Sequence, residues 1–198
     1  MIRLFPNAGG WLEVVCGPMF SGKSEELIRR LRRAEIAGQR VLIVKPKIDN
    51  RYDISHVVSH AGAKMRAVAV GSPADIPGLV EGYDVIGVDE VQFFAPEIVF
   101  VLDGLVEKGM RVLVSGLDQD FRGSPFGPMP ELLCRAELVD KLQAVCHRCA
   151  GPATMTQRLV DGAPAPADGA TIVVGALEQY EARCRTCHEL AAPAFATG

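Results

Sequence analysis

An eight-residue stretch near the N-terminus constrains the fold of this chain more than any other feature. Residues 17–24 read GPMFSGKS, which matches the phosphate-loop pattern G-x-x-x-x-G-K-[ST]. In such a loop, which joins a strand to a helix, backbone N–H groups wrap the phosphates of a nucleotide. Lys23 is placed to reach the β- and γ-phosphates, and Ser24 to bind Mg²⁺. The stretch therefore predicts phosphate binding on a strand–loop–helix unit.

The residues on both sides of this loop predict alternating strands and helices up to about residue 145. Apolar runs that are typical of strands buried on both faces cover residues 12–16, 41–44, 84–88 and 111–114. One helix is expected to follow the phosphate loop and to end near Gly38, and another is expected over residues 96–109. This alternation predicts an α/β fold, with a P-loop NTPase-like parallel sheet flanked by helices.

Two adjacent carboxylates, Asp89 and Glu90, follow one of the expected strands. A carboxylate at this end of a strand, beside a phosphate loop, holds Mg²⁺ directly or through water, and we assign this part to Asp89. Successive side chains on an extended segment point to opposite sides, so Glu90 is placed to act as a general base toward a hydroxyl group or a water. The alternative is that the pair only ends a strand in solvent.

Four of the six cysteines form two C-x-x-C pairs, and this spacing is typical of metal sites. Cys146, Cys149, Cys184 and Cys187 would together close a tetrahedral, structural Zn²⁺ site; the alternative is four free thiols in the core. Between the pairs we expect two short strands, over 154–160 and 171–174, joined by a loop. The other two cysteines, at positions 16 and 134, are expected to be buried.

This pattern predicts two domains, residues 1–145 and a small zinc-ribbon domain over residues 146–198. The second has 4 basic and 5 acidic residues, which is a poor footprint for a nucleic-acid backbone. The 198-residue chain has a formal charge of −3, too near balance for a general polyanion binder. No apolar run approaches the roughly 18–20 residues that cross a bilayer, and the first residues lack the apolar core of a signal peptide. We therefore expect a cytoplasmic protein without nucleic-acid or membrane partners.

The loop that follows the last expected strand of the sheet, GLDQDFRGSPFG at residues 116–127, should border the ligand site. Ligands of open α/β sheets bind outside the carboxyl ends of the strands. Leu117, Phe121 and Phe126 offer apolar surface for a flat ring, and Arg122 offers charge. The alternative is a surface loop that its phenylalanines anchor to the core.

In this combination, GPMFSGKS, VDEVQFF, GLDQDFRGSPF and the paired cysteines resemble the zinc-containing cytosolic thymidine kinases, from about Trp11 to Glu189. The resemblance implies transfer of the γ-phosphate of ATP to the 5′-hydroxyl of thymidine. It makes Glu90 the base that takes the hydroxyl proton. It further implies Mg²⁺ with ATP, structural Zn²⁺, a homotetramer and feedback inhibition by dTTP. Residues 1–145 become the ATP-binding kinase domain, and residues 146–198 the zinc-binding domain with a lasso loop that closes over the nucleoside.

The resemblance also assigns binding residues. The ATP-binding set is Gly17, Pro18, Met19, Phe20, Ser21, Gly22, Lys23, Ser24, Asp89, Glu90, Val91 and Gln92. The nucleoside-binding set is Met19, Phe93, Leu117, Phe121, Phe126, Thr156, Val174, Gly175 and Tyr180, with the lasso loop gripping the thymine largely through its backbone. Asp49 and Arg51 are expected near the phosphates. The rival hypothesis is a P-loop ATPase with a zinc ribbon that acts on nucleic acid; a GTPase is disfavoured because the chain has no Asn-Lys-x-Asp motif.

Overall fold

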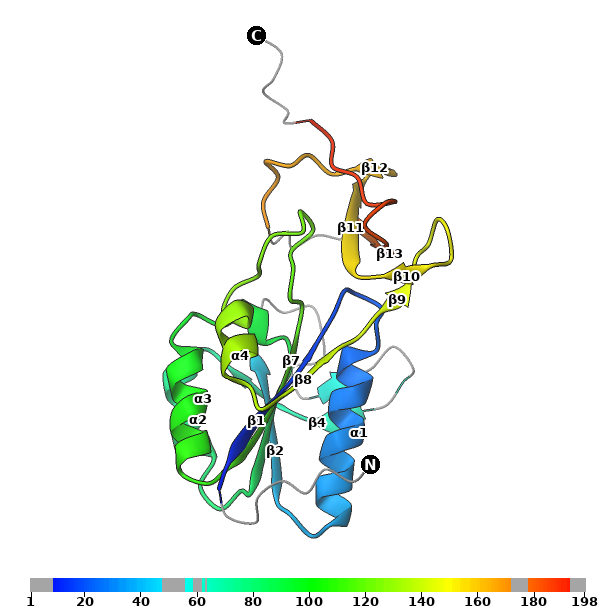
Figure 1. The fold of residues 1–198 in the computed structure, drawn as a ribbon. Coiled ribbons are helices and arrows are strands. Elements are labelled where there is room, and N and C mark those ends of the chain that lie inside the picture. The colour runs from blue at the N-terminus through cyan, green and yellow to red at the C-terminus, as the bar shows by residue number, and fades with distance from the viewer. Residues whose placement is uncertain (1–8, 48–55, 59–61, 63, 172–177, 193–198) are drawn as a thin grey trace.

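The computed structural model describes residues 9–47, 56–58, 62, 64–171 and 178–192. Its centre is a parallel sheet of six strands in the order β5-β2-β6-β7-β1-β8 (Figure 1). In chain order these strands are β1 (Trp11–Cys16), β2 (Val41–Pro46), β5 (Val68–Val70), β6 (Val85–Val88), β7 (Arg111–Gly116) and β8 (Leu138–Lys141). The predicted parallel sheet is therefore confirmed, and each apolar run that predicted a strand lies on one of its strands.

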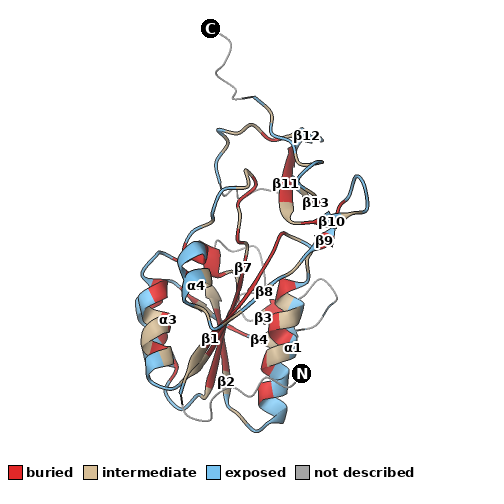
Figure 2. Cartoon of the chain, viewed as in Figure 1, coloured by how far each residue is buried: buried red, intermediate tan, exposed pale blue. Residues whose placement is uncertain are grey.

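Helices cover both faces of this sheet. They are α1 (Lys23–Ile36), α2 (Ile76–Leu79), α3 (Ile98–Glu107) and α4 (Met129–Arg135), with the short 3₁₀ turns η1 (Pro73–Asp75) and η2 (Val91–Phe93). α1 packs against one face through its buried residues Leu27, Ile28, Leu31 and Ala34, while α2, α3 and α4 pack against the other. Figure 2 shows the buried residues along the strands and the inner faces of the helices.

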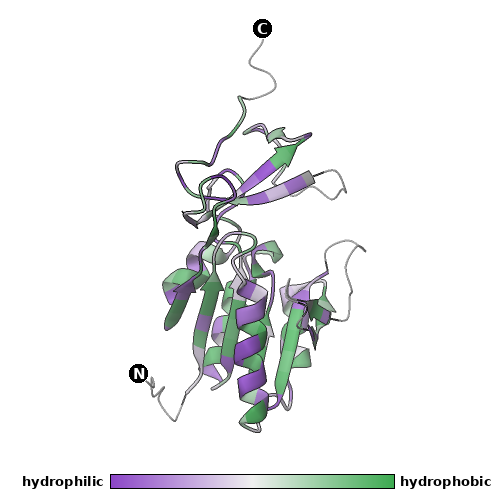
Figure 3. Cartoon of the chain, turned by 90° about the vertical axis from the view of Figure 1, so that its right-hand side faces the viewer, coloured by the Kyte–Doolittle hydropathy of each residue, from purple (hydrophilic) through white to green (hydrophobic). Residues whose placement is uncertain are grey.

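The side chains of each strand alternate between these two cores. On β7, Val112 and Val114 pack with α3, whereas Leu113 packs with α1. Burial of each such side chain stabilises the fold by about 1.5–3 kcal/mol. Gly87 on β6 lets α1 approach closely, because a Cβ atom there would lie 2.4 Å from Cδ1 of Leu31. Figure 3 shows the same arrangement coloured by hydropathy: hydrophobic strands lie behind a helix that carries both hydrophilic and hydrophobic residues.

Glu13 is a charged residue that is buried on β1 of the central sheet, where it is 2% exposed and both of its carboxylate oxygens accept hydrogen bonds. It accepts hydrogen bonds from Arg30, Arg111 and the indole nitrogen of Trp11, each at 2.8 Å. A buried carboxylate is tolerated when its oxygens are satisfied in this way. This network joins α1 to β1 and β7.

A smaller set of strands follows β8 and lies beyond the carboxyl ends of the central strands (Figure 1). The short strands β9 (Ala144–Val145) and β10 (Pro152–Ala153) form one pair, and β11 (Met155–Val160) lies between β12 (Ala163–Pro164) and β13 (Glu178–Arg183). All of these pairings are antiparallel. A separate antiparallel pair, β3 (His56–Val58) and β4 (Lys64–Arg66), lies beside α1.

One prediction of local structure lies mostly outside the described residues, and another needs correction. Of the strand expected at 171–174, residues 172–174 lie outside the described residues and Thr171 lies in a bend, while the partners of β11 among the described residues are β12 and β13. Cys16 is buried as expected, whereas Cys134 is exposed. The reason is that the short helix α4 buries Met129 and Leu132, and Cys134 lies about 200° around the helix from Leu132.

None of the helices among the described residues has the length and apolar character that a membrane span requires.

Candidate functional site

The phosphate loop joins β1 to α1, as its sequence predicts. Gly17 has φ +142° and Gly22 φ +84°, values that favour glycine. A Cβ atom on Gly17 would also lie 2.5 Å from the carbonyl oxygen of Leu142. The helix begins at Lys23, whose side chain is buried and donates from Nζ to the carbonyl oxygen of Pro18 at 2.7 Å. The lysine is thus held against the loop that it is expected to serve.

Asp89 lies directly after β6 and faces this loop. Its Oδ1 atom accepts hydrogen bonds from the Ser24 hydroxyl, at 3.4 Å, and from the Ser115 hydroxyl on β7. The side chain is buried, and burial raises its pKa above the usual aspartate value. Ser24 and Asp89, the two residues predicted to hold Mg²⁺, therefore lie together, and their hydroxyl and carboxylate oxygens are ligands that suit Mg²⁺.

Glu90 departs from the extended backbone that the sequence argument assumed. It has φ +53° and ψ +39°, the left-handed conformation, and it precedes η2. A left-handed residue other than glycine carries strain of about 1–3 kcal/mol, which proteins retain mainly at functional positions. Its carboxylate accepts a hydrogen bond from Nε2 of Gln92, whereas Asp89 accepts from serines. Burial and the nearby charge of Asp89 raise the pKa of Glu90.

Gln92 connects this carboxylate to the loop that follows β7. Its side chain is 2% exposed, and its Oε1 atom accepts a hydrogen bond from the backbone N–H of Leu117 at 3.1 Å. Gly116 makes room for it, since a Cβ atom at that position would lie 2.6 Å from Oε1. Sequence reasoning placed Gln92 among the ATP-binding residues and missed this bridge. Both ends of its amide contact protein atoms, and no motif signals a contact across 25 residues.

The residues expected to bind the nucleoside lie on several elements around the ends of β6 and β7. The rings of Phe93 and Phe126 meet edge to face, with centroids 5.4 Å apart. Thr156, which is buried on β11, accepts a hydrogen bond from the backbone N–H of Met19 at 3.0 Å, so the phosphate loop contacts the C-terminal strands directly. Tyr180 lies on β13, where it pairs with Arg158.

Other predicted residues lie apart from these contacts or outside the described residues. Phe121 is 4% exposed, and the guanidinium groups of Arg122 and Arg158 both lie against its ring. Val174 and Gly175 lie outside the described residues, and so do Asp49 and Arg51.

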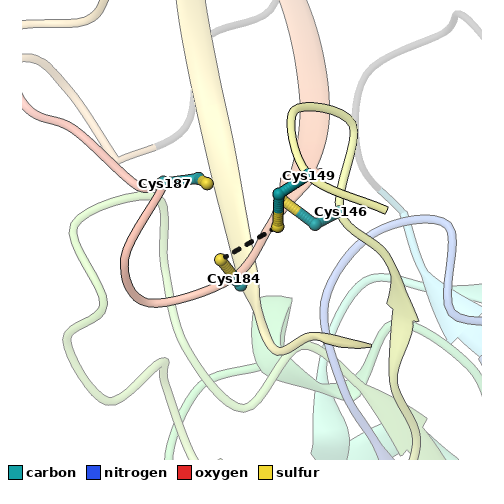
Figure 4. A group of neighbouring side chains, drawn as sticks. All are labelled: Cys146, Cys149, Cys184 and Cys187. Atoms are coloured by element: carbon teal, nitrogen blue, oxygen red, sulfur yellow. Dashed lines mark hydrogen bonds between the residues drawn. The ribbon is translucent and has the colours of Figure 1, made fainter. Parts of the chain in front are cut away.

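The four paired cysteines come together at the base of the C-terminal strands (Figure 4). Their Sγ atoms all lie within 4.8 Å of one another, and those of Cys149 and Cys184 are 3.7 Å apart. Four thiolates around one Zn²⁺, with Zn–S bonds of about 2.3 Å, would be about 3.8 Å apart. The donor set and its geometry therefore fit a structural metal ion such as zinc, as predicted.

The fold and the site define a class of protein before any comparison. A glycine-rich phosphate loop between β1 and α1, with a serine and an aspartate beside it, is the phosphate site of P-loop nucleotide-binding proteins. Here the same chain also carries four clustered cysteines that could hold a metal ion.

Comparison with known proteins identifies the family. The family model described as thymidine kinase matches residues 10–188, so the chain belongs to the thymidine kinase family, as its motifs predicted. Among solved structures, the chain is similar to the ATPase DotB of Legionella pneumophila, with 19% sequence identity and a TM-score of 0.39. That match covers 66% of this chain and about a third (35%) of the Legionella protein.

Proposed function

We propose that this protein transfers the γ-phosphate of ATP to the 5′-hydroxyl of thymidine, giving dTMP and ADP. The observation that carries the proposal is the position of Glu90, directly after the Asp89 that faces the phosphate loop, in a chain of the thymidine kinase family. The Asp89 carboxylate thus lies beside the phosphate loop, where it accepts hydrogen bonds from Ser24 and Ser115, whereas the Glu90 carboxylate accepts a hydrogen bond from Gln92. Phosphoryl transfer needs two such carboxylates in separate roles, one beside the Mg²⁺ and the phosphates and one that accepts the proton of the attacking hydroxyl.

On the phosphate side, the backbone of residues 17–24 binds the ATP phosphates and Lys23 neutralises charge on them. Lys23 then exchanges the Pro18 carbonyl for phosphate oxygens. Mg²⁺ bound with ATP supplies further charge neutralisation. Ser24 and Asp89 are the residues that would hold it. Such preorganised charge is the larger part of catalysis in this reaction, since little covalent chemistry is required of the protein.

On the nucleoside side, Glu90 accepts the proton of the 5′-hydroxyl. Its raised pKa makes it a better proton acceptor than an ordinary glutamate, provided that it is ionised at the working pH. Gln92 holds the carboxylate while its other end holds Leu117. Phe93 and Phe126 offer aromatic surface to the thymine ring. Thr156 and Tyr180, which follow the first cysteine pair, also contribute to nucleoside binding.

The domain assignment is part of the same proposal. Residues 1–145 form the ATP-binding kinase domain, and residues 146–198 form the zinc-binding domain that encloses the nucleoside. Enclosure favours transfer to thymidine over hydrolysis of ATP, because it keeps water from the γ-phosphate. Family membership also supports nucleotide salvage for DNA synthesis, a cytoplasmic location, a homotetramer and inhibition by dTTP.

The test is ADP release with purified protein, Mg²⁺ and ATP. We expect release with thymidine, and little with ATP alone or with 5′-deoxythymidine, which lacks the attacking hydroxyl. Equal release without thymidine would contradict the proposal. Release that DNA or RNA stimulates would instead favour the rival ATPase.

A further inference from the structure

The side chain of Arg122 ties the loop of residues 117–126 to the segment 167–171 by hydrogen bonds. Its Nε donates to the carbonyl oxygen of Ala167 at 2.7 Å, and its Nη2 donates to the carbonyl oxygen of Gly169. Its Nη1 donates to the hydroxyl of Thr171 at 2.9 Å. One guanidinium group thus holds three residues of the same segment. A planar fork with several donors suits this task, and a lysine could not reproduce it.

Arg122 is itself held by its own loop. Its Nη1 also donates to Oδ2 of Asp120 at 2.7 Å, and Oδ1 of Asp120 accepts from the backbone N–H groups of Arg122 and Ser124. Asp120 is 7% exposed. The carboxylate therefore fixes both the turn and the arginine, with charge-assisted hydrogen bonds in a poorly hydrated place.

A second arginine, Arg158 on β11, holds the same segment and lies near the same aromatic ring as Arg122. The guanidinium of Arg122 lies 4.4 Å from the ring centroid of Phe121, and that of Arg158 on β11 lies 5.0 Å from it. Arg158 donates from Nη1 to the carbonyl oxygen of Ala170 at 2.6 Å. A Cβ atom on Gly169 would lie 3.8 Å from Phe121 and 3.6 Å from Arg158, so the segment packs directly on this group.

These contacts join elements that also carry the nucleoside-binding residues. The loop that bears Arg122 begins at Leu117, which Gln92 holds, and ends at Phe126, which packs on Phe93. The strand that bears Arg158 also bears Thr156, which contacts the phosphate loop. Three members of the nucleoside-binding set, Leu117, Phe121 and Phe126, lie on the loop that Arg122 ties to segment 167–171. A displacement of this segment would therefore alter the nucleoside side of the site before the phosphate side.

We infer that Arg122 is a positioning residue for the nucleoside: it fixes residues 167–171 against the loop of residues 117–126 and so sets the affinity for thymidine. This inference rests on the proposed function and extends it to a residue that does not touch the reacting atoms. Its loss raises the KM for thymidine, while the KM for ATP, which depends on the phosphate loop, stays near its original value.

The variants Arg122→Lys and Arg122→Ala test the inference, with Arg135→Lys as a matched control. Arg135 also lies beside a phenylalanine ring and two carboxylates, but on α4, with Phe100, Asp103 and Glu131 as its partners. For each protein we would measure zinc content, kcat, both KM values, and hydrogen exchange of the amides of residues 165–171 by mass spectrometry. Exchange needs no activity, so it reports on the segment by itself.

For both Arg122 variants we expect a KM for thymidine raised by about tenfold or more, the size of effect that follows when charge-assisted hydrogen bonds to a binding segment are lost. The KM for ATP and kcat should stay within about threefold, and amides of the segment should exchange faster. Arg135→Lys should change none of these values. An unchanged KM for thymidine, or KM values for thymidine and ATP that rise together, would overturn the inference.

Failure of the proposed function would look different. The unmodified protein would then show no thymidine phosphorylation, but hydrogen exchange over residues 165–171 would still test whether Arg122 fixes this segment. Faster exchange in Arg122→Lys would support that structural role, and unchanged exchange would refute it.

Discussion

Replacement of Glu90 by glutamine removes proton acceptance and little else. The glutamine has nearly the same shape, and its amide oxygen can still accept the hydrogen bond from Gln92. The left-handed backbone at this position is unaffected by the change, since both side chains begin with the same atoms. The contact of Gln92 with Leu117 does not involve residue 90 at all. The effect of Glu90→Gln on turnover therefore reports the chemistry of the carboxylate.

A positioned general base contributes about 10²–10⁴ to the rate, equivalent to about 2.7–5.4 kcal/mol in the activation free energy. A loose transition state needs the proton removed late, so we expect Glu90→Gln to lower kcat toward the low end, about 10². Binding of thymidine and ATP should change little, which calorimetry can check. The assay is kcat at saturating thymidine and Mg²⁺-ATP.

The pH dependence of kcat provides a second test of Glu90 as the general base. Burial and Asp89 raise the pKa of Glu90 above its usual value of 4.5. Because a base acts only when it is deprotonated, kcat of the original protein should fall as the pH drops through this raised pKa. Glu90→Gln should lack that decline. A variant with more than about half the original kcat, or with an unchanged pH profile, would refute Glu90 as the base.

Three further predictions concern the phosphate loop, the metal site and the stability of α1. Lys23→Ala should lower kcat about 10²–10³-fold while the fold persists by circular dichroism, since a transition-state charge partner is lost; near-normal turnover would contradict its role. With zinc bound, a thiol reagent should modify Cys134 alone; a chelator should expose the four paired cysteines, and only unfolding should expose Cys16, whose pKa burial raises to about 11. Rapid reaction of the paired cysteines before chelation would speak against the metal site. Hydrogen bonds from Arg29 and then Arg30 lower the pKa of Glu26 to about 2 from 4.5, so Glu26→Gln should reduce the free energy of unfolding by about 1 kcal/mol at neutral pH. The folded pKa is the lower one, so this difference should shrink as the pH falls from about 4.5 toward 2, and a difference independent of pH would contradict the ion pairs.

Much of the central sheet could be predicted because its signals are local. The apolar runs at β1, β2, β6 and β7 mark strands buried on both faces, and the glycines and lysine of the phosphate loop require a strand before them and a helix after them. The cysteine pairs were equally informative, since chelation fixes their spacing whatever the surrounding fold.

The remainder depends on contacts between residues that are distant in sequence. Gln92 meets Leu117 across 25 residues, and Arg122 meets Gly169 across 47. The left-handed backbone of Glu90 follows from the turn into η2 and has no signature in a pattern of charged and apolar residues. Phe121 could equally have been a ring on an open surface; only the structure places two arginines against it.

The most direct test of thymidine 5′-phosphorylation by this protein is to identify the product. The protein would be incubated with Mg²⁺-ATP and thymidine, ADP and nucleotide would be quantified together, and the attachment site would be read from phosphorus–proton coupling by NMR. We predict one dTMP for each ADP, with the phosphate coupled to the two 5′ protons. ADP without an equal amount of nucleotide, or phosphate coupled to the single 3′ proton, would contradict the account.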